Sequence, residues 1–429
     1  MINPLAKELN DTLAGSVVDA LMSDMGRRLY FPNGIISQGG EAAKDAHFAN
    51  GTIGMAVAQG TPIELDSYKK NMPSLTPRET VAYAKTAGNP DLRALWKEKI
   101  IEKNPSLKNK QFSLPILVPG LTAVLSYVSD LFVDVDKPLL AADPCWDNYE
   151  LIVAARRGAE FHQFKCFENG KFNIADLEAK MKADAEKYGS VRVILNFPQN
   201  PSGYSPTVSE AKEIVRIVRE IAESGKKVLV LSDDAYFGLN YEDDIEPQSL
   251  FAYMADLHEN VLAIKADGPT KEDFAWGFRA GFVTFASKGL SDAQYTALVT
   301  KFMAAIRSSV SCSATPSQSL VMHALNDEAH NKQKIECRKM LKRRYDLVRK
   351  FVNTHTSKVL EPLPFNSGYF MSFHVSTGKA EEIRKALLKE KGIGIIQIDS
   401  HTLRVAFSSI DEDKIDSVYT SIYNVADAL

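Results

Sequence analysis

The sequence predicts an α/β protein: a large domain whose mostly parallel sheet lies between layers of helices, and a smaller α+β domain. Two observations lead to this prediction. From about Pro115, short apolar runs typical of buried strands alternate with stretches in which apolar residues recur at helical spacing. Beyond about residue 315, this alternation gives way to a long charged helical stretch and then to short strands and helices.

The expected elements follow this pattern along the chain. Residues 1–60 are rich in Gly and Asn and are expected to form an arm with one short helix. A helix begins just after Gly120, and a capping box at Thr207 and Glu210 begins another that runs to about Glu223. A long, bent helical region is expected from Pro316 to Phe351. Strands are expected at 138–142, 191–195, 228–231, 261–264 and 278–285.

The domain organisation follows from these elements. Residues 1–60 are expected to form the arm and part of the small domain, 61–315 the large domain, and 316–429 the C-terminal small domain. The change of pattern near residue 315 sets the second boundary.

Composition and charge exclude several classes of protein. The 429 residues are 45% hydrophobic and 24% charged, as in ordinary globular proteins, and the net charge of -3 provides no basic field for nucleic acid. No apolar run approaches the ~20 residues that cross a bilayer. The first residues lack the pattern of a secretory signal, so a cytoplasmic protein is expected. The cysteines lack the spacing of a metal site, so free thiols and no bound metal are expected: Cys145, Cys166, Cys312 and Cys337.

Polar and aromatic side chains gather where the predicted strands end. The carboxyl ends of parallel strands meet at one edge of a sheet, where ligands bind in open α/β proteins. The residues expected there are Asp143, Trp146, Asn200, Asp233, Tyr236, Lys271 and Arg279. Together, they indicate a ring-shaped anionic cofactor better than any one of them does alone.

Three of these segments occur in a characteristic order. They are NFPQNPSG with Asn200, SDDAYFG with Asp233 and Tyr236 three residues apart, and GPTKEDFAWGFRAG with Lys271 and Arg279 eight apart. In this combination, the sequence resembles the class I aminotransferases, which are fold type I pyridoxal-phosphate enzymes.

The resemblance extends from about Tyr83 to Arg404 and implies a fold, a cofactor and a reaction. The fold is a mostly parallel seven-stranded sheet sandwiched by helices, with a smaller α+β domain, and the cofactor is pyridoxal 5'-phosphate. The reaction is reversible transfer of an amino group between an L-amino acid and a 2-oxo acid, with the aspartate and aromatic branch the most similar. The implied assembly is a homodimer with shared active sites, without nucleic-acid or membrane partners.

Lys271 resembles the family's lysine that binds the cofactor aldehyde as a Schiff base. An amine attacks an aldehyde only when it is unprotonated, so the site must lower the pKa of the amine or accept its proton. Once the substrate frees it, the same amine can move a proton between the substrate α-carbon and the cofactor. The alternative is a solvated lysine beside Glu272 and Asp273.

Four further residues resemble those that surround the cofactor ring. Asp233 is expected to face the pyridine nitrogen and keep the ring protonated, with a turn role or the neighbouring Asp234 as alternatives. Asn200 and Tyr236 are expected to hydrogen-bond the phenolic oxygen of the ring, although Asn-Pro-Ser-Gly is also a good turn by itself. Trp146 is expected to stack on the ring, with ordinary core packing as its alternative.

The phosphate of the cofactor is expected at the start of the helix that follows Pro119. Free amides at a helix start favour an anion, and a threonine hydroxyl adds a donor; this segment is Gly120, Leu121 and Thr122. Arg279 offers a fork that matches phosphate oxygens. Tyr83 resembles the tyrosine that reaches the phosphate of the neighbouring subunit, with a buried helix aromatic as the alternative.

One position departs from the family. Ser or Thr usually stands three residues before the lysine and donates to the phosphate, but here that position is Gly268. Thr270, directly before Lys271, is the candidate replacement.

Substrate contacts are assigned by the same resemblance. Arg404, in LRVAF, resembles the arginine that binds the substrate α-carboxylate as a bidentate clamp, with a surface arginine as the alternative. Gly54, in TIGMAV, resembles the loop glycine that lets backbone approach this carboxylate, and Asn200 is also expected to contact the substrate. Arg307 is a candidate second cation for an acidic substrate side chain, with a helix-surface arginine as the alternative.

The same residues leave two other functions open. A β-lyase or an amino-acid decarboxylase can use this cofactor on the same fold, and its products would be pyruvate and ammonia or carbon dioxide. A non-catalytic cofactor-binding module is the third possibility, although no basic DNA-reading segment is attached.

Overall fold

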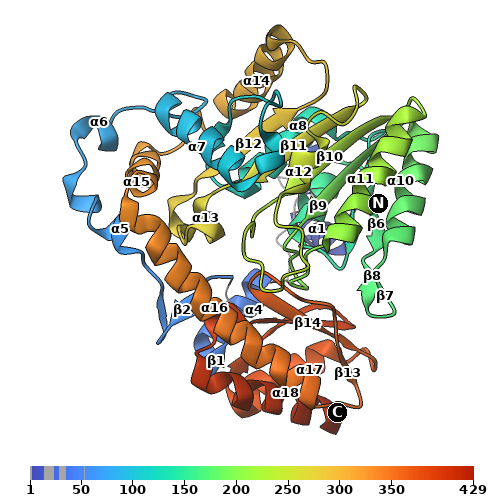
Figure 1. Cartoon of the computed structure of the whole chain (residues 1–429). Coiled ribbons are helices and arrows are strands. Elements are labelled where there is room, and N and C mark those ends of the chain that lie inside the picture. The colour runs from blue at the N-terminus through green and yellow to red at the C-terminus, as the bar shows by residue number, and fades with distance from the viewer. Residues whose placement is uncertain (1, 14–23, 29–34, 53) are drawn as a thin grey trace.

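The computed structural model describes residues 2–13, 24–28, 35–52 and 54–429, which form a larger and a smaller unit (Figure 1). The larger unit is built on a seven-stranded sheet, and the smaller one on a four-stranded antiparallel sheet. The long helix α16 (Glu328–Thr354) runs from the larger unit into the smaller one. None of the described helices is long and apolar enough to cross a membrane.

The large sheet has the strand order β4-β12-β11-β10-β9-β5-β6. The strands from β11 to β6 are parallel to one another, and β12 runs antiparallel to both of its neighbours. The bounds are β4 (Ile116–Val118), β5 (Leu139–Asp143), β6 (Phe161–Lys165), β9 (Ser190–Asn196), β10 (Lys227–Asp233), β11 (Val261–Asp267) and β12 (Gly281–Ala286). The prediction of a mostly parallel sheet is therefore confirmed.

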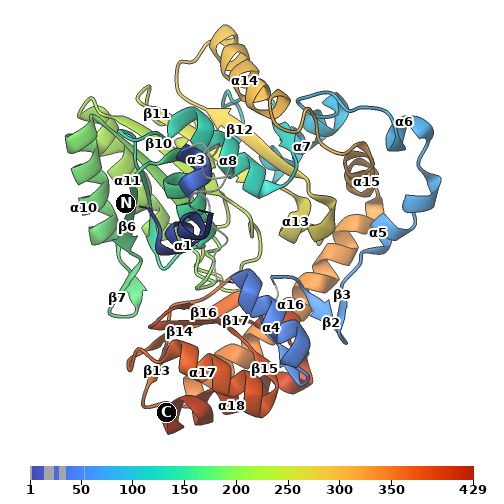
Figure 2. The same cartoon turned by 180° about the vertical axis from the view of Figure 1, so that it is seen from behind.

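Helices cover both faces of this sheet (Figures 1 and 2). In β10, Val228 and Val230 pack into one buried cluster, whereas Leu229 and Leu231 pack into another on the opposite face. Because side chains alternate between the faces of a strand, a strand covered on both faces is apolar throughout. The helices are α7 (Pro90–Lys103), α10 (Ile174–Tyr188), α11 (Val208–Glu223) and α12 (Leu250–Met254) on the first face, and α8 (Leu121–Phe132) and α14 (Asp292–Arg307) on the second.

The predicted helix starts are confirmed, but one strand begins later than predicted. α8 begins after Gly120, whose φ is 90°, and the predicted capping box begins α11. The prediction that Arg279 lies in a strand is wrong. Arg279 has left-handed backbone angles, φ 50° and ψ 49°, after a 3₁₀ turn at Trp276–Phe278, so β12 begins only at Gly281.

The predicted helical region from Pro316 to Phe351 is interrupted. It consists of α15 (Thr315–Leu325) and α16, which are separated at Asn326 and Asp327. The Asp327 carboxylate accepts a hydrogen bond from Ala329 N at 3.0 Å and so caps the second helix.

The smaller unit combines the C-terminal segment with part of the N-terminal one (Figure 2). Its main sheet has the order β13-β14-β17-β16, with bounds β13 (Leu360–Pro362), β14 (Phe370–Val375), β16 (Ile396–Asp399) and β17 (Thr402–Ala406). Helices α17 (Ala380–Ala386) and α18 (Ile415–Ala428) pack in the same core. β1 (Ala49–Asn50) pairs in parallel with β15 (Ile393–Gly394), and this pairing joins the two chain segments.

The N-terminal segment is more helical than predicted. Where one short helix was expected, the described residues of this segment form α1 (Pro4–Leu13), α3 (Asp24–Arg28) and α4 (Ile35–Asp45). Arg28 Nε donates to Ala155 O at 3.0 Å, which ties α3 to the larger unit. α4 lies against the smaller unit, where Gln38 Nε2 donates to Gln397 O at 2.9 Å.

Short elements complete the described part of the chain. They are α5 (Asp66–Lys69), α6 (Pro77–Thr80), α9 (Asn148–Glu150), α13 (Pro269–Glu272), the hairpin of β2 (Val57–Ala58) with β3 (Thr61–Pro62), and the hairpin of β7 (Phe167–Glu168) with β8 (Lys171–Phe172). The four cysteines are free thiols, as predicted.

Candidate active site

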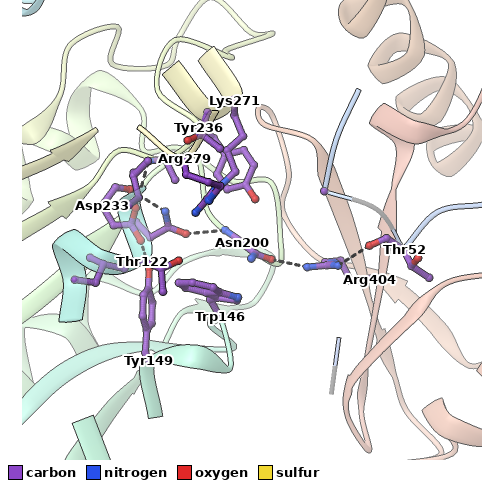
Figure 3. Close-up of a pocket in the computed structure, with 16 residues that line it drawn as sticks. Thr52, Thr122, Trp146, Tyr149, Asn200, Asp233, Tyr236, Lys271, Arg279 and Arg404 are labelled. Atoms are coloured by element: carbon purple, nitrogen blue, oxygen red, sulfur yellow. Dashed lines mark hydrogen bonds between the residues drawn. The ribbon is translucent and has the colours of Figure 1, made fainter. Parts of the chain in front are cut away.

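A cavity of about 220 Å³ lies at the carboxyl ends of the parallel strands (Figure 3). Most of the predicted site residues line it: Gly54, Leu121, Thr122, Trp146, Asn200, Asp233, Tyr236, Thr270, Lys271, Arg279 and Arg404. The cavity is also lined by residues that the sequence did not single out: Thr52, Leu125, Tyr149, Asn196 and Ala235. Residues from both sheets therefore meet at one cavity.

The parallel register explains why distant motifs meet here. Asp233, the last residue of β10, is opposite Asn196, the last residue of β9. Asn196 Nδ2 donates to Asp233 O at 2.8 Å, and Asn196 Oδ1 accepts from Asn200 N at 2.8 Å. Asn196 thus fixes the turn that presents Asn200 to the cavity.

Lys271 extends from α13 toward the ring of Tyr236. Its Nζ lies 4.7 Å from the centroid of that ring, and within the described ranges no carboxylate forms an ion pair with it. Burial lowers the pKa of Lys271 to about 8; the charge of Asp233 opposes this shift and that of Arg279 adds to it. A much larger share of the amine is therefore neutral near physiological pH than for an ordinary lysine.

The acidic residues that follow Lys271 do not solvate it. Glu272 and Asp273 are both buried. Glu272 pairs with Lys103 at 2.7 Å, and Asp273 pairs with Lys334 and with His330 on α16. These contacts hold the segment around Lys271 between α7 and α16. The segment is therefore buried, and the alternative of a solvated lysine does not fit the structure.

Asp233 faces the cavity and Asp234 does not. The side chain of Asp233 is 3% exposed, and its Oδ2 accepts a hydrogen bond from Tyr149 Oη at 2.5 Å. Burial raises the pKa of Asp233, and the bond from Tyr149 opposes this shift. Asp234 instead pairs with the buried Lys265 and accepts from Ser249 Oγ at 2.6 Å. The alternative assignment of the cavity carboxylate to Asp234 is thus wrong.

Arg404 reaches the cavity from β17 of the smaller unit. Its Nη1 donates to Asn200 Oδ1 at 2.9 Å, and its Nη2 donates to Thr52 O at 3.1 Å. The residue is 2% exposed, and within the described structure its Nε has no hydrogen-bond partner. Burial lowers the pKa of Arg404 to about 10, with the charges of Tyr236 and Asp147 opposing the shift. A buried guanidinium with an open donor suits a carboxylate ligand.

The start of α8 forms a cradle for an anion. Within the described structure, the amides of Leu121 and Thr122 donate to no protein acceptor, as expected at a helix start. The guanidinium of Arg279 lies against Gly120, where a Cβ would collide with it. A Cβ on Gly281 would lie 2.6 Å from the carbonyl carbon of Gly120. Gly281 is therefore required by the close approach of backbone around this cradle, and Gly120 is favoured by its positive φ of 90°.

The backbone around Gly268 explains why no hydroxyl residue stands there. A Cβ on Gly268 would lie 2.9 Å from Ala280 O and 3.1 Å from the Cα of Gly281. Thr270 lines the cavity, with its Oγ1 3.4 Å from Ala280 O. The threonine is therefore the hydroxyl residue available on this segment.

Three predicted site residues do not line the cavity: Gly120, Tyr83 and Arg307. Tyr83 is 96% exposed, so the expectation of a buried helix aromatic is wrong. Arg307 ends α14, and its Nη1 donates to Ser311 Oγ at the surface. Neither Tyr83 nor Arg307 lines the cavity of its own chain.

A family model described as aminotransferase class I and II matches residues 55–422. The chain belongs to this family. The matched range includes the cavity-lining residues from Leu121 to Arg404, so the aminotransferase motifs and the geometry concern the same site.

Curated relatives match this chain over part of their length. A "Probable aminotransferase" of Mycobacterium tuberculosis is 31% identical over 144 residues, which are 33% of this chain and 30% of the relative. A "Probable aspartate/prephenate aminotransferase" of Rickettsia felis is 26% identical over 203 residues, 47% of this chain and 46% of the relative. The chain thus matches about a third to a half of the length of these relatives.

Solved structures resemble this chain in fold over nearly its whole length. An aminotransferase from Anaerococcus prevotii has a TM-score of 0.84 and 22% identity, covering 95% of this chain and 99% of its own. The kynurenine aminotransferase of Pyrococcus horikoshii, described in complex with PMP, has a TM-score of 0.78 and 17% identity, covering 97% and 99%. These likenesses show that the fold is that of the fold type I aminotransferases.

The sequence held signals for two further cavity residues, Tyr149 and Asn196, which were not among the predicted site residues. Tyr149 follows Trp146 by three residues, which is helical spacing. Asn196 directly follows the predicted strand 191–195, as Asp233 nearly does for its own strand. Their positions in the sequence were enough to suggest Tyr149 and Asn196 as cavity residues, but the groups that they contact depend on how the strands pair.

Proposed function

We propose that this chain is a pyridoxal-phosphate-dependent aminotransferase that moves an amino group between an L-amino acid and a 2-oxo acid. The observation that supports this most directly is the environment of Lys271. A buried amine with a pKa lowered to about 8 shares one cavity with Asp233 and with an anion cradle. A nucleophilic lysine needs such an environment to react with an aldehyde.

The donor set of the cavity fits pyridoxal 5'-phosphate. The phosphate would be held by the free amides at the start of α8 and by Arg279, with hydroxyls from Thr122 and Thr270. Asp233 would hold the pyridine nitrogen. Asn200, Tyr236 and Trp146 would contact the ring; these three assignments rest on the family resemblance and on their place in the cavity.

The reaction divides between the cofactor and the chain. When bound, pyridoxal phosphate supplies an electron sink for the charge that develops at the substrate α-carbon. Arg404 binds the substrate carboxylate through its open donor, which orients the amino group toward Lys271. The neutral Nζ of Lys271 then takes the proton from the α-carbon as a general base.

The preferred amino acid is proposed to be of the aspartate or aromatic type. The family resemblance supports this choice, and one matched relative is named an aspartate/prephenate aminotransferase. Arg307 lies outside the cavity of its own chain, so any contact between it and an acidic side chain would be made in the partner subunit.

A homodimer with shared sites is proposed as the working assembly. Tyr83 and Val81 are 96% and 84% exposed on the segment after α6. Exposed apolar side chains this close together favour a protein contact. A second copy would cover them and receive the Tyr83 hydroxyl at its own phosphate cradle.

We further propose that residues 1–60 form an arm and part of the small domain, 61–315 the large domain, and 316–429 the C-terminal small domain. The pairing of β1 with β15 supports the assignment of part of the first segment to the small domain. A cytoplasmic location is proposed because the four cysteines are unpaired, as in a reducing compartment.

The test is a set of spectra of the purified protein with pyridoxal phosphate. L-aspartate, L-glutamate, L-tyrosine and L-alanine are added separately, and Lys271→Ala is the matched variant. We expect the visible band of the bound cofactor to convert to that of its amine form with one class of donor, and only when Lys271 is present. A protein that stays colourless would refute the proposal, whereas release of pyruvate and ammonia, or of carbon dioxide, would favour the lyase or decarboxylase.

A further inference from the structure

A buried phenol contacts the carboxylate that would hold the cofactor ring. Tyr149 lies on α9, and its backbone N donates to Trp146 O at 3.1 Å, so both rings are fixed by one turn. The two rings meet edge to face, with centroids 5.6 Å apart and an interplanar angle of 81°. Figure 3 shows Tyr149 rising beside Trp146 toward Asp233.

The local helix geometry at Tyr149 is unusual. α9 continues directly into a π-helical turn at Leu151–Ala155. Such turns are uncommon and often occur at functional sites. Here the turn follows the residue that reaches Asp233.

The hydrogen bond from Tyr149 has one direction. Burial, and next the charge of Asp233, raise the pKa of Tyr149 well above its ordinary value, so the phenol keeps its proton and donates it. Tyr149 Oη lies 2.5 Å from Asp233 Oδ2, a short distance typical of a bond to an ionised acceptor. Among the described residues, the other oxygen of Asp233 accepts a single, longer bond, from Ala235 N at 3.3 Å.

The charged groups around Asp233 act in opposite directions. Burial favours its neutral form most strongly, and the adjacent Asp234 adds to this, although Lys265 pairs with Asp234. Tyr149 and Lys271 favour the ionised form, and the hydrogen bond from Tyr149 is the larger of these two effects. Lys271 favours the ionised form of Asp233 only while its nitrogen carries a positive charge, whereas the hydrogen bond from Tyr149 does not depend on that charge.

We propose that Tyr149 is a positioning residue, whose hydroxyl keeps Asp233 ionised and oriented so that this carboxylate can hold a proton on the cofactor's pyridine nitrogen. The inference rests on the proposed function and deepens it. An unprotonated pyridine withdraws fewer electrons from the substrate α-carbon, so loss of the hydroxyl should slow the chemical step. Substrate binding at Arg404 should change little, since Tyr149 does not contact that residue.

The experiment compares the wild-type holoenzyme with Tyr149→Phe, which removes only the hydroxyl. The first readout is the ¹⁵N chemical shift of labelled pyridoxal phosphate between pH 6 and 9, which reports protonation of the ring nitrogen. We expect a protonated nitrogen throughout in the wild type and a nitrogen that titrates within this range in the variant. kcat should fall about 10- to 100-fold with KM within about twofold, as for loss of one charge-assisted hydrogen bond.

Two further variants separate positioning from simple packing. Tyr295→Phe removes a buried hydroxyl that bonds Ser287 N at 3.0 Å outside the cavity, and it should change neither readout. In an Asp233→Asn background, Tyr149→Phe should have little additional effect on kcat, because the hydroxyl acts through the carboxylate. Should Tyr149→Phe fail to fold, 3-fluorotyrosine at position 149 keeps the ring and donates more strongly, so the nitrogen should deprotonate at a higher pH.

The outcomes distinguish this inference from the proposed function. A wild type that binds no cofactor overturns both. A wild-type holoenzyme that transaminates, with the same nitrogen titration in Tyr149→Phe as in the wild type, overturns the role of Tyr149 alone. An equal loss of kcat in the presence and absence of the Asp233 carboxylate would also overturn it.

Discussion

Arg404 Nη1 donates to Asn200 Oδ1 over 2.9 Å, and this bond joins the sheet of the smaller unit to the turn that follows β9 of the larger one. The same guanidinium holds Thr52 O at 3.1 Å. Three segments that lie far apart in the sequence are therefore positioned around one substrate-sized cavity by a single side chain (Figure 3).

Replacing Arg404 by Lys should weaken substrate use while the cofactor stays bound. Lysine keeps the charge but lacks the planar fork, so at least one charge-assisted hydrogen bond is lost. We expect kcat/KM to fall about 10- to 150-fold, the effect of losing about 1.5–3 kcal/mol. Steady-state kinetics measure this, and Arg343→Lys, at an exposed pair with Glu412, is the matched control. Unchanged kinetics in Arg404→Lys would exclude Arg404 from the carboxylate site.

Uptake of pyridoxal phosphate by the cofactor-free chain should depend on pH through Lys271. Only the neutral amine attacks the aldehyde, and burial lowers the pKa of Lys271 to about 8. The rate should therefore rise with pH, have its midpoint near 8, and level off above it. Stopped-flow absorbance measures this rate.

Asp233→Asn tests the direction in which the midpoint of this pH dependence should move. The negative charge of Asp233 favours the protonated lysine, so its removal should move the midpoint to lower pH. A midpoint near the usual lysine value of about 10.4 would show that burial does not perturb the amine.

Gly268→Ser should destabilise the protein without strengthening cofactor binding. The added Cβ would lie 2.9 Å from Ala280 O, and backbone has little freedom to move away. We expect a loss of about 1–3 kcal/mol in the free energy of unfolding, typical of overpacking. Thermal denaturation measures it, and Gly277→Ser, where a Cβ meets nothing within 4 Å, is the control. A tighter-binding, equally stable Gly268→Ser would contradict this account of the glycine.

Shared active sites can be tested by mixing two defective chains. Lys271→Ala removes the reactive amine, and Tyr83→Ala removes the hydroxyl that is proposed to serve the partner's cofactor. A mixed dimer would contain one site with both residues intact, so random exchange should restore about a quarter of the wild-type activity. Activity is measured at a cofactor concentration too low for Tyr83→Ala alone. If the activity of the mixture is only the average of the activities of the two variants, Tyr83 does not contribute to the active site of the partner subunit.

Local patterns predicted much of this protein. The apolar runs placed five of the seven strands of the large sheet, but not β4 and β6, and the turn, Asp-x-x-Tyr and lysine segments named most of the residues that line the cavity. Such patterns succeed because a strand buried on both faces must be apolar, and because parallel strands present their carboxyl ends at one edge. The number of N-terminal helices and the start of β12 were predicted less well, since short segments depend on what they pack against.

Only the tertiary structure decided which side chains face the cavity and which groups are buried together. The spacing to Tyr236 favoured Asp233 over Asp234, but only the fold shows that Asp233 faces the cavity and that Asp234 pairs with Lys265. In the sequence, Gly268 stands where the family usually has a hydroxyl residue. The structure shows the physical reason, because the backbone of Ala280 leaves no room for a side chain at this position. The sequence thus determined which chemical groups the protein has and where most of its helices and strands lie along the chain, whereas only the fold decided which groups are buried together. The pKa of Lys271 and the bond from Tyr149 to Asp233 depend on desolvation and on contacts within a few ångströms, and these arise only when the strands pair.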